Sequence, residues 1–160
     1  MLFRSLLTRP LMILSVKLGP AGRECTAIPV DAGDRLEVEY VHSMYGVRQT
    51  EVFSVGPEPS FRLEKVLFGS LAAALYYEPE PASGITFQDG FWAIRGDGKH
   101  YPILRFRVST TSHHTLRIRG QTVDLMSLSA GTDGLTWMAI ERRTRLASLF
   151  AALRRTIPSG

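Results

Sequence analysis

Apolar and polar residues alternate along most of this chain, and turn-forming residues recur at short intervals. Side chains on a strand point alternately to opposite faces, so this alternation predicts strands with one buried face. The expected strands are Leu11–Leu18, Glu24–Val30, Leu36–His42, Val47–Val55, Phe61–Phe68, Ile85–Phe87, Phe91–Arg95, Ile103–Ser109, Thr115–Arg119, Thr122–Leu128 and Leu135–Glu141. Many short strands separated by turns favour an all-β fold, either a single antiparallel β-barrel or a sandwich.

Two segments depart from the strand pattern. Gly69–Pro81 is rich in alanine and then in proline, which predicts a short helical turn followed by an ordered loop. At the C-terminus, apolar residues recur at helical spacing between arginines, which predicts a short basic amphipathic helix. Its apolar stripe either packs on the domain or lies at an anionic membrane surface. We therefore expect an N-terminal extension over 1–10, a β-rich domain over 11–141 and the helix over 142–160.

The segment from Tyr40 to Glu51 is predicted to form a β-hairpin with polar residues on its inner face. If the turn centres on Tyr45 and Gly46, His42 lies opposite Gln49 and Tyr40 lies opposite Glu51, all on the inner face. His42 and Glu51 then become diagonal neighbours. An unpaired polar group in a protein interior costs about 1–3 kcal/mol. We therefore expect His42 and Glu51 to be hydrogen-bonded, either as a structural pair or as part of a ligand pocket.

The same segment contains the residue types of a hydrolase, because Ser43 follows His42 directly. On a regular strand, however, consecutive side chains point to opposite faces, and a catalytic triad needs serine and histidine in hydrogen-bond contact. No Gly-x-Ser-x-Gly motif occurs in the sequence. Hydrolysis is therefore the weakest of three hypotheses, and we expect a protein that is not an enzyme. Trp92 is either a core residue or a wall of the ligand pocket.

Four arginines are predicted to form a basic patch. A hairpin between the strands Ile103–Ser109 and Thr115–Arg119 would set Arg107 opposite Arg117 and Arg105 opposite Arg119. Like charges placed opposite each other destabilise a sheet, so acidic groups should lie nearby. One interpretation is an adjacent acidic strand that carries Glu37 and Glu39. The other is a docking patch for an anionic partner.

Composition narrows the range of partners. The chain has 160 residues, a formal net charge of +4 and a single cysteine, Cys25. One cysteine permits neither an internal disulfide nor a multi-cysteine zinc site, and no histidine spacing suggests a metal or a cofactor. The basic balance suits an anionic small molecule, an acidic protein or an anionic membrane surface. No motif typical of nucleic-acid binding is present, so we expect no nucleic-acid partner.

The N-terminal segment begins like an export signal but does not continue as one. Arg9 and Pro10 interrupt the apolar run that starts at Leu2, and Leu11–Val16 is better interpreted as a strand. A signal peptide needs roughly 7–15 uninterrupted apolar residues, and a membrane-spanning helix needs about 20. The sequence therefore gives no clear export signal and leaves a cytoplasmic location open.

Three short motifs occur in a fixed order along the chain. The first is Tyr40-Val41-His42-Ser43, followed by Glu51. The second is Asp89-Gly90-Phe91-Trp92-Ala93-Ile94 with Pro102-Ile103-Leu104 downstream, and the third is Leu116–Gly131 with Val123-Asp124-Leu125 inside it. Together, over roughly Leu11 to Glu141, they resemble the family known as domain of unknown function 1850. Gly69–Ala74 departs from the glycine-rich segment that the family usually carries.

This resemblance implies a small β-rich accessory protein without enzymatic activity. Members of the family typically accompany the TAXI-type subunits of tripartite ATP-independent periplasmic (TRAP) transporters, which implies a periplasmic or membrane-associated location. The first hypothesis is thus an accessory protein that binds a TRAP membrane subunit, a solute-receptor subunit or the transported solute. The alternative is a stand-alone small-molecule-binding β-barrel. A cavity of about 300 Å³ or more lined by His42, Glu51 and Trp92 would favour that alternative.

Overall fold

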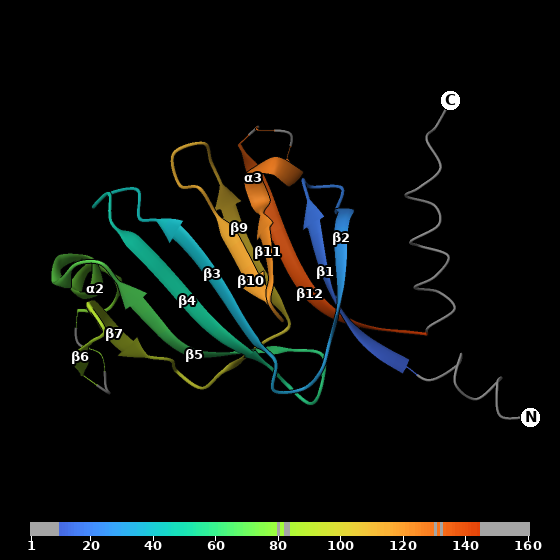
Figure 1. The fold of residues 1–160 in the computed structure, drawn as a ribbon, viewed down its shortest axis with the longest axis horizontal. Coiled ribbons are helices and arrows are strands. Elements are labelled where there is room, and N and C mark those ends of the chain that lie inside the picture. The colour runs from blue at the N-terminus through green and yellow to red at the C-terminus, as the bar shows by residue number, and fades with distance from the viewer. Residues whose placement is uncertain (1–9, 80, 82–83, 130, 132, 145–160) are drawn as a thin grey trace, which may run out of the picture.

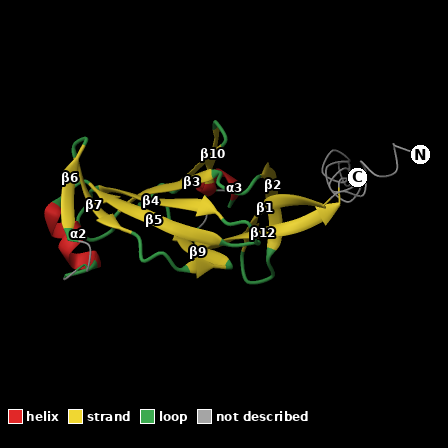
Figure 2. Ribbon diagram, turned by 90° about the horizontal axis from the view of Figure 1, so that it is seen from below, coloured by secondary structure: helices red, strands yellow, loops and turns green. Residues whose placement is uncertain are grey.

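The described residues form two antiparallel β-sheets that share one core (Figure 1). The computed structural model describes residues 10–79, 81, 84–129, 131 and 133–144. The sheets do not close into a barrel, so of the two predicted architectures the barrel is wrong. Figure 2 shows α2 (Leu71–Tyr77) at one end of an elongated molecule and the outer ends of β1 (Pro10–Leu18) and β12 (Gly134–Thr144) at the other.

The smaller sheet has four strands in the order β2-β1-β12-β9. Besides β1 and β12 it contains β2 (Arg23–Val30) and β9 (Ile103–Val108). β9 pairs with β12 along one side only and therefore forms an edge of the sheet. An edge strand presents unpaired backbone N–H and C=O groups along its free side.

The larger sheet has eight strands, in the order β11-β10-β3-β4-β5-β7-β6 with β8 paired to β5. The strands are β3 (Arg35–Val41), β4 (Arg48–Val55), β5 (Phe61–Phe68), β6 (Ile85–Gln88), β7 (Phe91–Arg95), β8 (His100–Tyr101), β10 (Thr115–Ile118) and β11 (Gln121–Asp124). All the predicted strands are present, with ends that match or differ by up to three residues, except that Thr122–Leu128 ends four residues earlier. The strand β8 is the addition.

The core forms where apolar residues from both sheets meet. Its fully buried side chains include Leu14 and Met138 from the smaller sheet and Leu36, Phe61 and Leu116 from the larger one. Burying one such side chain contributes roughly 1.5–3 kcal/mol relative to leaving it exposed. The shared core fixes how the two sheets face each other.

The predicted helical turn within 69–81 is confirmed as α2, which Ser70 caps by accepting a hydrogen bond from the Ala73 backbone N–H. The predicted strand Thr122–Leu128 is partly wrong, because it ends at Asp124 and α3 (Leu125–Leu128) follows. The Asp124 carboxylate accepts hydrogen bonds from the Met126 backbone N–H and from the Ser127 hydroxyl. Such an N-cap satisfies donors at a helix start, and this local effect outweighs the apolar alternation.

The domain boundaries shift at both ends of the β-rich part. Pro10, expected in the N-terminal extension, begins β1, and 142–144, expected in the C-terminal helix, continue β12 as strand. The remainder of both predicted segments, 1–9 and 145–160, lies outside the described residues. Neither α2 nor α3 has the length and hydropathy that crossing a bilayer requires, and no other helix of the described ranges does.

Candidate functional site: a cleft beside the edge strand β9

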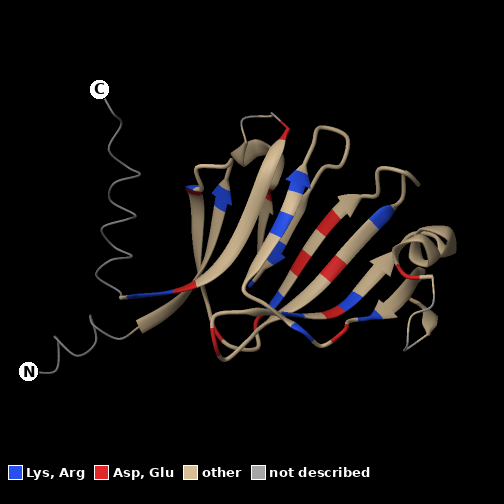
Figure 3. Cartoon of the chain, turned by 180° about the vertical axis from the view of Figure 1, so that it is seen from behind, with Lys and Arg blue, Asp and Glu red and all other residues tan. Residues whose placement is uncertain are grey.

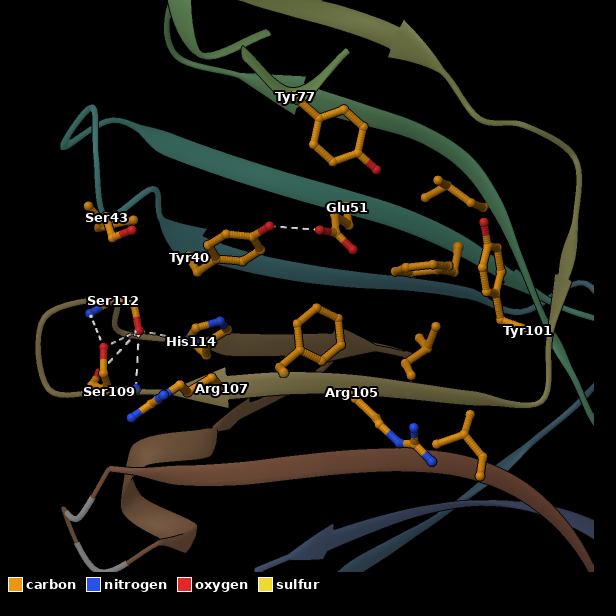
Figure 4. A pocket seen from close by; sticks show the side chains of 16 residues that line it. Tyr40, Ser43, Glu51, Tyr77, Tyr101, Arg105, Arg107, Ser109, Ser112 and His114 are labelled. Atoms are coloured by element: carbon orange, nitrogen blue, oxygen red, sulfur yellow. Dashed lines mark hydrogen bonds between the residues drawn. The ribbon is translucent and has the colours of Figure 1, made fainter.

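A cleft of about 610 Å³ lies between the inner face of β3 and β4 and the edge strand β9. Consecutive residues from Ile103 to Arg107 border it, although they alternate between the two faces of β9. Residues on both faces can line one cavity only if the cavity runs along the free edge of the strand. Figure 4 shows the cleft with Tyr40, Glu51 and Tyr77 on one side and β9 on the other.

Glu51 is the most unusual group in the cleft. Its carboxylate accepts a hydrogen bond of 2.7 Å from the Tyr40 hydroxyl. Among the described residues, it forms no ion pair with any lysine, arginine or histidine. Burial raises the pKa of Glu51, and the hydrogen bond from Tyr40 opposes that rise only in part. A carboxyl group kept in a cleft without a cationic partner often marks a functional site.

Register explains why Glu51 meets Tyr40 instead of His42. The structure pairs Tyr40 with Gln49 and Val38 with Glu51, a shift of two residues from the predicted register. The loop closes through two bonds of 2.8 Å, from His42 N–H to Val47 O and from Gly46 N–H to His42 O. The prediction that Glu51 lies on the inner face is confirmed, because a shift of two keeps every side chain on its face. The predicted His42–Glu51 pair is wrong.

Aromatic side chains surround Glu51. Tyr40, Tyr77, Tyr101, Phe53 and Phe106 all line the cleft. Burial, followed by the charge of Glu51, raises the pKa of Tyr77 to about 12. The same two causes raise the pKa of Tyr40 strongly, so both hydroxyls stay protonated near neutral pH. The cleft is thus lined by one carboxylate, that of Glu51, and by several aromatic rings. Both kinds of group attract positive charge.

His114 closes one end of the cleft and carries no charge at neutral pH. Its ring stacks on Tyr40 with 4.7 Å between centroids, and its Nδ1 lies 3.0 Å from the Ser112 hydroxyl. Burial lowers the pKa of His114 to about 4. Ser112 and Ser109 exchange hydrogen bonds between their hydroxyls and backbone N–H groups, which fixes the turn after β9.

This serine–histidine contact differs from a hydrolytic pair. In a catalytic triad the serine contacts Nε2, and a carboxylate orients the imidazole through Nδ1. Here Ser112 occupies Nδ1, and no described carboxylate contacts His114. His42 and Ser43, the pair suggested by sequence, share no hydrogen bond, because the His42 Nδ1 accepts from the Met44 backbone N–H at 3.3 Å.

His42 and Ser43 border a second cavity of about 310 Å³ next to the cleft. Tyr40, Ser43 and Tyr77 line both cavities, so the two are neighbours. Gln49 lines the second one with its side chain only 2% exposed, and its Oε1 atom has no hydrogen-bond partner in the described structure. A buried oxygen that finds no donor within the described chain can accept a hydrogen bond from water or from a molecule bound in the cavity.

The predicted four-arginine patch is wrong as a single hairpin, because β9 pairs with β12 while β10 pairs with β3 and β11. Arg117 donates two hydrogen bonds to Glu39, as the acidic-strand interpretation expected, and Arg119 contacts Asp31 at 3.0 Å. Arg105 and Arg107 have no acidic partner in the described part of the chain. Figure 3 shows the basic positions along β9 and the acidic ones on β3.

Trp92 lies away from the cleft. It belongs to β7, two strands from β4, and its ring centroid is 4.9 Å from that of Phe87. Trp92 lines neither described cavity, so its packing against the core agrees with the structural interpretation. Within the described ranges, no three His, Cys, Asp or Glu side chains come together as metal ligands would.

Sequence reasoning missed several cleft residues, among them Tyr77, Tyr101 and His114. Tyr77 comes from α2, Tyr101 from β8 and His114 from the turn before β10, so no single periodic segment contains them. Tyr40 differs from these three, because strand alternation predicts it on the inner face together with Glu51. The hydrogen bond from its hydroxyl to Glu51 is the part that the predicted pairing of Glu51 with His42 left out.

Comparison with known families adds an identification. The model of the family described as "Domain of unknown function (DUF1850)" matches residues 36–125, more than half of the 160-residue chain. The chain belongs to the DUF1850 family. The DUF1850 match contains Tyr40, Glu51, Tyr77 and His114, whereas β1 and β12 lie outside it. A search of curated proteins and a search of solved structures each found no match.

Proposed function

We propose that this DUF1850 protein binds a small organic solute in the cleft and works, without catalysis, as an accessory protein of a TAXI-type TRAP transporter. The observation that carries the binding proposal is the cleft of about 610 Å³ with Glu51 in it. Ligand sites typically measure 300–1,000 Å³ and combine apolar walls with a few convergent polar groups. The transporter association rests on the family resemblance.

A non-enzymatic role fits the chemistry of the cleft. His114 is a weak base, because its pKa lies at about 4, and no described carboxylate orients its ring. Tyr40 and Tyr77 hold their protons beyond neutral pH. These groups are suited to orient a ligand through hydrogen bonds and ring contacts more than to transfer protons at neutral pH.

Solute binding can be tested by narrowing the cleft from its rim. Ile103 borders the cleft and is 36% exposed, so Ile103→Trp adds bulk there without entering the core. Leu135→Trp on β12 is the matched control, since Leu135 is 42% exposed and does not line the cleft. Solutes that bind the wild-type cleft are recognised because they shift the backbone amide NMR signals of Tyr40 and Glu51. We expect the affinity of the protein for these solutes to fall at least tenfold in Ile103→Trp and to stay unchanged in Leu135→Trp. Equal affinity in both variants would reject the cleft as the site.

A second candidate function is docking of a transporter subunit along β9. The free edge of β9 can accept an added strand, and the unpaired Arg105 and Arg107 would attract acidic side chains on it. A second copy of this chain does not fit, because its own β9 would place arginine near arginine. The partner expected here is therefore an extended acidic segment of a transporter subunit.

Docking can be separated from solute binding by co-purification from native membranes at low and high salt. We expect transporter subunits to accompany the wild-type chain at low salt and to be released at high salt, because the exposed charges are screened. Arg105→Glu with Arg107→Glu should abolish recovery, while Arg62→Glu with Arg95→Glu should not. Recovery of no transporter subunit at either salt concentration would count against the transporter association itself.

A further inference from the structure

The two cavities share an imbalance between hydrogen-bond acceptors and donors. Glu51 and Gln49 both lie on the inner face of β4, two residues apart, and point toward neighbouring cavities. Gln49 Oε1 has no donor, and Glu51 has no cationic partner in the described structure. The Gln49 oxygen is costly to bury, since an unpaired acceptor loses its water without compensation. The Glu51 carboxylate accepts one hydrogen bond, from Tyr40, but its charge has no cationic partner.

The protein groups around Glu51 do not supply the missing positive charge. Tyr40 on β3, Tyr77 on α2 and Tyr101 on β8 are neutral phenols, and Asp97 binds the hydroxyl of Tyr101. His114 before β10 is neutral as well. Arg105 and Arg107 border the cleft from β9 without contacting Glu51. Figure 4 shows both arginines along the rim opposite Glu51.

We infer that the solute carries an ammonium group, which sits beside Glu51 among the tyrosine rings. An alkylammonium supplies up to three N–H donors and a positive charge. The aromatic rings of Tyr40, Tyr77 and Tyr101 line the same cleft, and aromatic rings favour a cation in addition to the carboxylate. Gln49 Oε1 offers a further acceptor in the adjoining cavity. This inference rests on the proposed function, because it names the chemistry of the solute in the same cleft.

A matched set of probes tests the ammonium group directly. Titration of the full chain with n-butylammonium, n-butanol and butyrate, followed by NMR, compares positive, neutral and negative head groups on unbranched molecules of four carbon atoms each. We expect n-butylammonium to bind at least tenfold more tightly than the other two. Stronger binding of butanol or butyrate would overturn the ammonium inference while leaving solute binding in the cleft intact. Absence of binding by all three would overturn the inference and weigh against the cleft as a solute site.

Two isosteric variants locate the contact. Glu51→Gln keeps an oxygen that can accept from Tyr40 but removes the charge, so it should weaken n-butylammonium binding at least tenfold. Glu64→Gln is the control, because Glu64 lies on β5, binds the Ser54 hydroxyl and does not border the cleft. Unchanged affinity in Glu51→Gln would overturn the inference. Circular dichroism of both variants checks that the fold is retained.

Proton linkage supplies a readout that a purely structural Glu51 would not give. The ammonium pairs with the ionised carboxylate, so any proton held by Glu51 must leave for solvent when the ligand binds. Because burial raises the pKa of Glu51, affinity should rise with pH until this group is fully ionised. Glu51→Gln should show no such rise. A pH profile that is the same in wild type and variant would overturn the assigned contact.

Discussion

The pKa values of partly buried glutamates shift in opposite directions in two regions of the molecule. One region is the face of the four-stranded sheet that points away from the core, called the far face below, and the other is the cleft. On that face, Glu141 contacts Lys17 and Arg143, and Arg143 also contacts Glu24. Burial by itself would raise the pKa of Glu141, but the hydrogen bonds from Lys17 and Arg143 outweigh it and lower the pKa. In the cleft, burial raises the pKa of Glu51 and no cation compensates.

This difference distinguishes ion pairs that stabilise the fold from titratable groups in the cleft that have no partner of opposite charge. The hydrogen bond to Glu24 raises the pKa of Arg143, so the contact favours the ionised guanidinium. In the cleft, by contrast, both Glu51 and His114 shift toward their neutral forms. Both groups have neutral hydrogen-bond partners but no partner of opposite charge, and titratable groups shifted in this way are typical of functional sites.

The largest effect we expect comes from His114 in acid. Its folded pKa of about 4 lies below the ordinary value of 6.5, so the unfolded chain binds more protons between these values. The contribution of His114 to stability is therefore full above pH 6.5, and up to about 3 kcal/mol of it is lost as the pH drops to 4. Urea unfolding at several pH values measures this loss.

The control for His114 is His114→Phe, which keeps a ring on Tyr40 but cannot titrate. The difference in unfolding free energy between wild type and this variant should change steeply between pH 6.5 and 4. A difference that stays constant over this interval would show that His114 does not resist protonation and would weaken the contrast between the two regions.

The next effect is expected on the far face of the four-stranded sheet. Arg143→Met removes the cation shared by Glu24 and Glu141, and should lower the free energy of unfolding by about 1–2 kcal/mol at pH 7. The loss should shrink in acid, because protonated carboxyls need no cation. Arg95→Met, at an exposed position on β7, should change stability by less than about 0.5 kcal/mol. Equal losses in both variants would contradict the structural role of the Arg143 contacts.

Removing the charge of Glu51 from the cleft should raise the free energy of unfolding at pH 7, whereas removing the charge of Arg143 should lower it. The raised pKa of Glu51 means that stability falls as the pH rises from the ordinary glutamate value through the raised one. Glu51→Gln avoids that loss and should stabilise the protein at pH 7. The gain should vanish in acid below the ordinary glutamate pKa, where wild-type Glu51 is protonated in both states. Thermal unfolding at pH 3.5 and pH 7 distinguishes these outcomes, and destabilisation at pH 7 would place Glu51 among the structural charges.

The smallest effects on the free energy of unfolding are expected for the arginines of the predicted basic patch, and these effects should differ between the arginines of β9 and Arg117. Arg105→Gln and Arg107→Gln remove charges that have no acidic partner in the described structure, and should each change stability by less than about 0.5 kcal/mol. Arg117→Gln breaks a two-bond contact with Glu39 and should cost up to about 1 kcal/mol. Urea unfolding of the three variants side by side is sufficient, and a larger loss at Arg105 or Arg107 would indicate a partner within the chain.

Several predictions from sequence followed from strand periodicity and were confirmed. Alternation placed Tyr40 and Glu51 on the inner face, and the cap residue Ser70 fits the helical turn that alanine content indicated. The predicted register of β3 and β4 differs from the observed one by two residues, because the prediction places a two-residue turn at Tyr45 and Gly46. The chain instead closes the loop between His42 and Val47. Backbone hydrogen bonds in the loop decide between these alternatives, and periodicity is identical in both.

The sequence by itself determined which residues form strands and which side chains share a face, because both depend on neighbours along one segment. Only the tertiary structure decided that β9 pairs with β12 instead of β10, since that choice depends on the turn at Ser109–Ser112 and on packing across both sheets. The same long-range choice leaves an open edge beside Glu51 and so creates the cleft. The ion-pair partners of a charged side chain come from strands that are far away in sequence. The residue pattern within one strand carries no information about how close those strands lie in the fold.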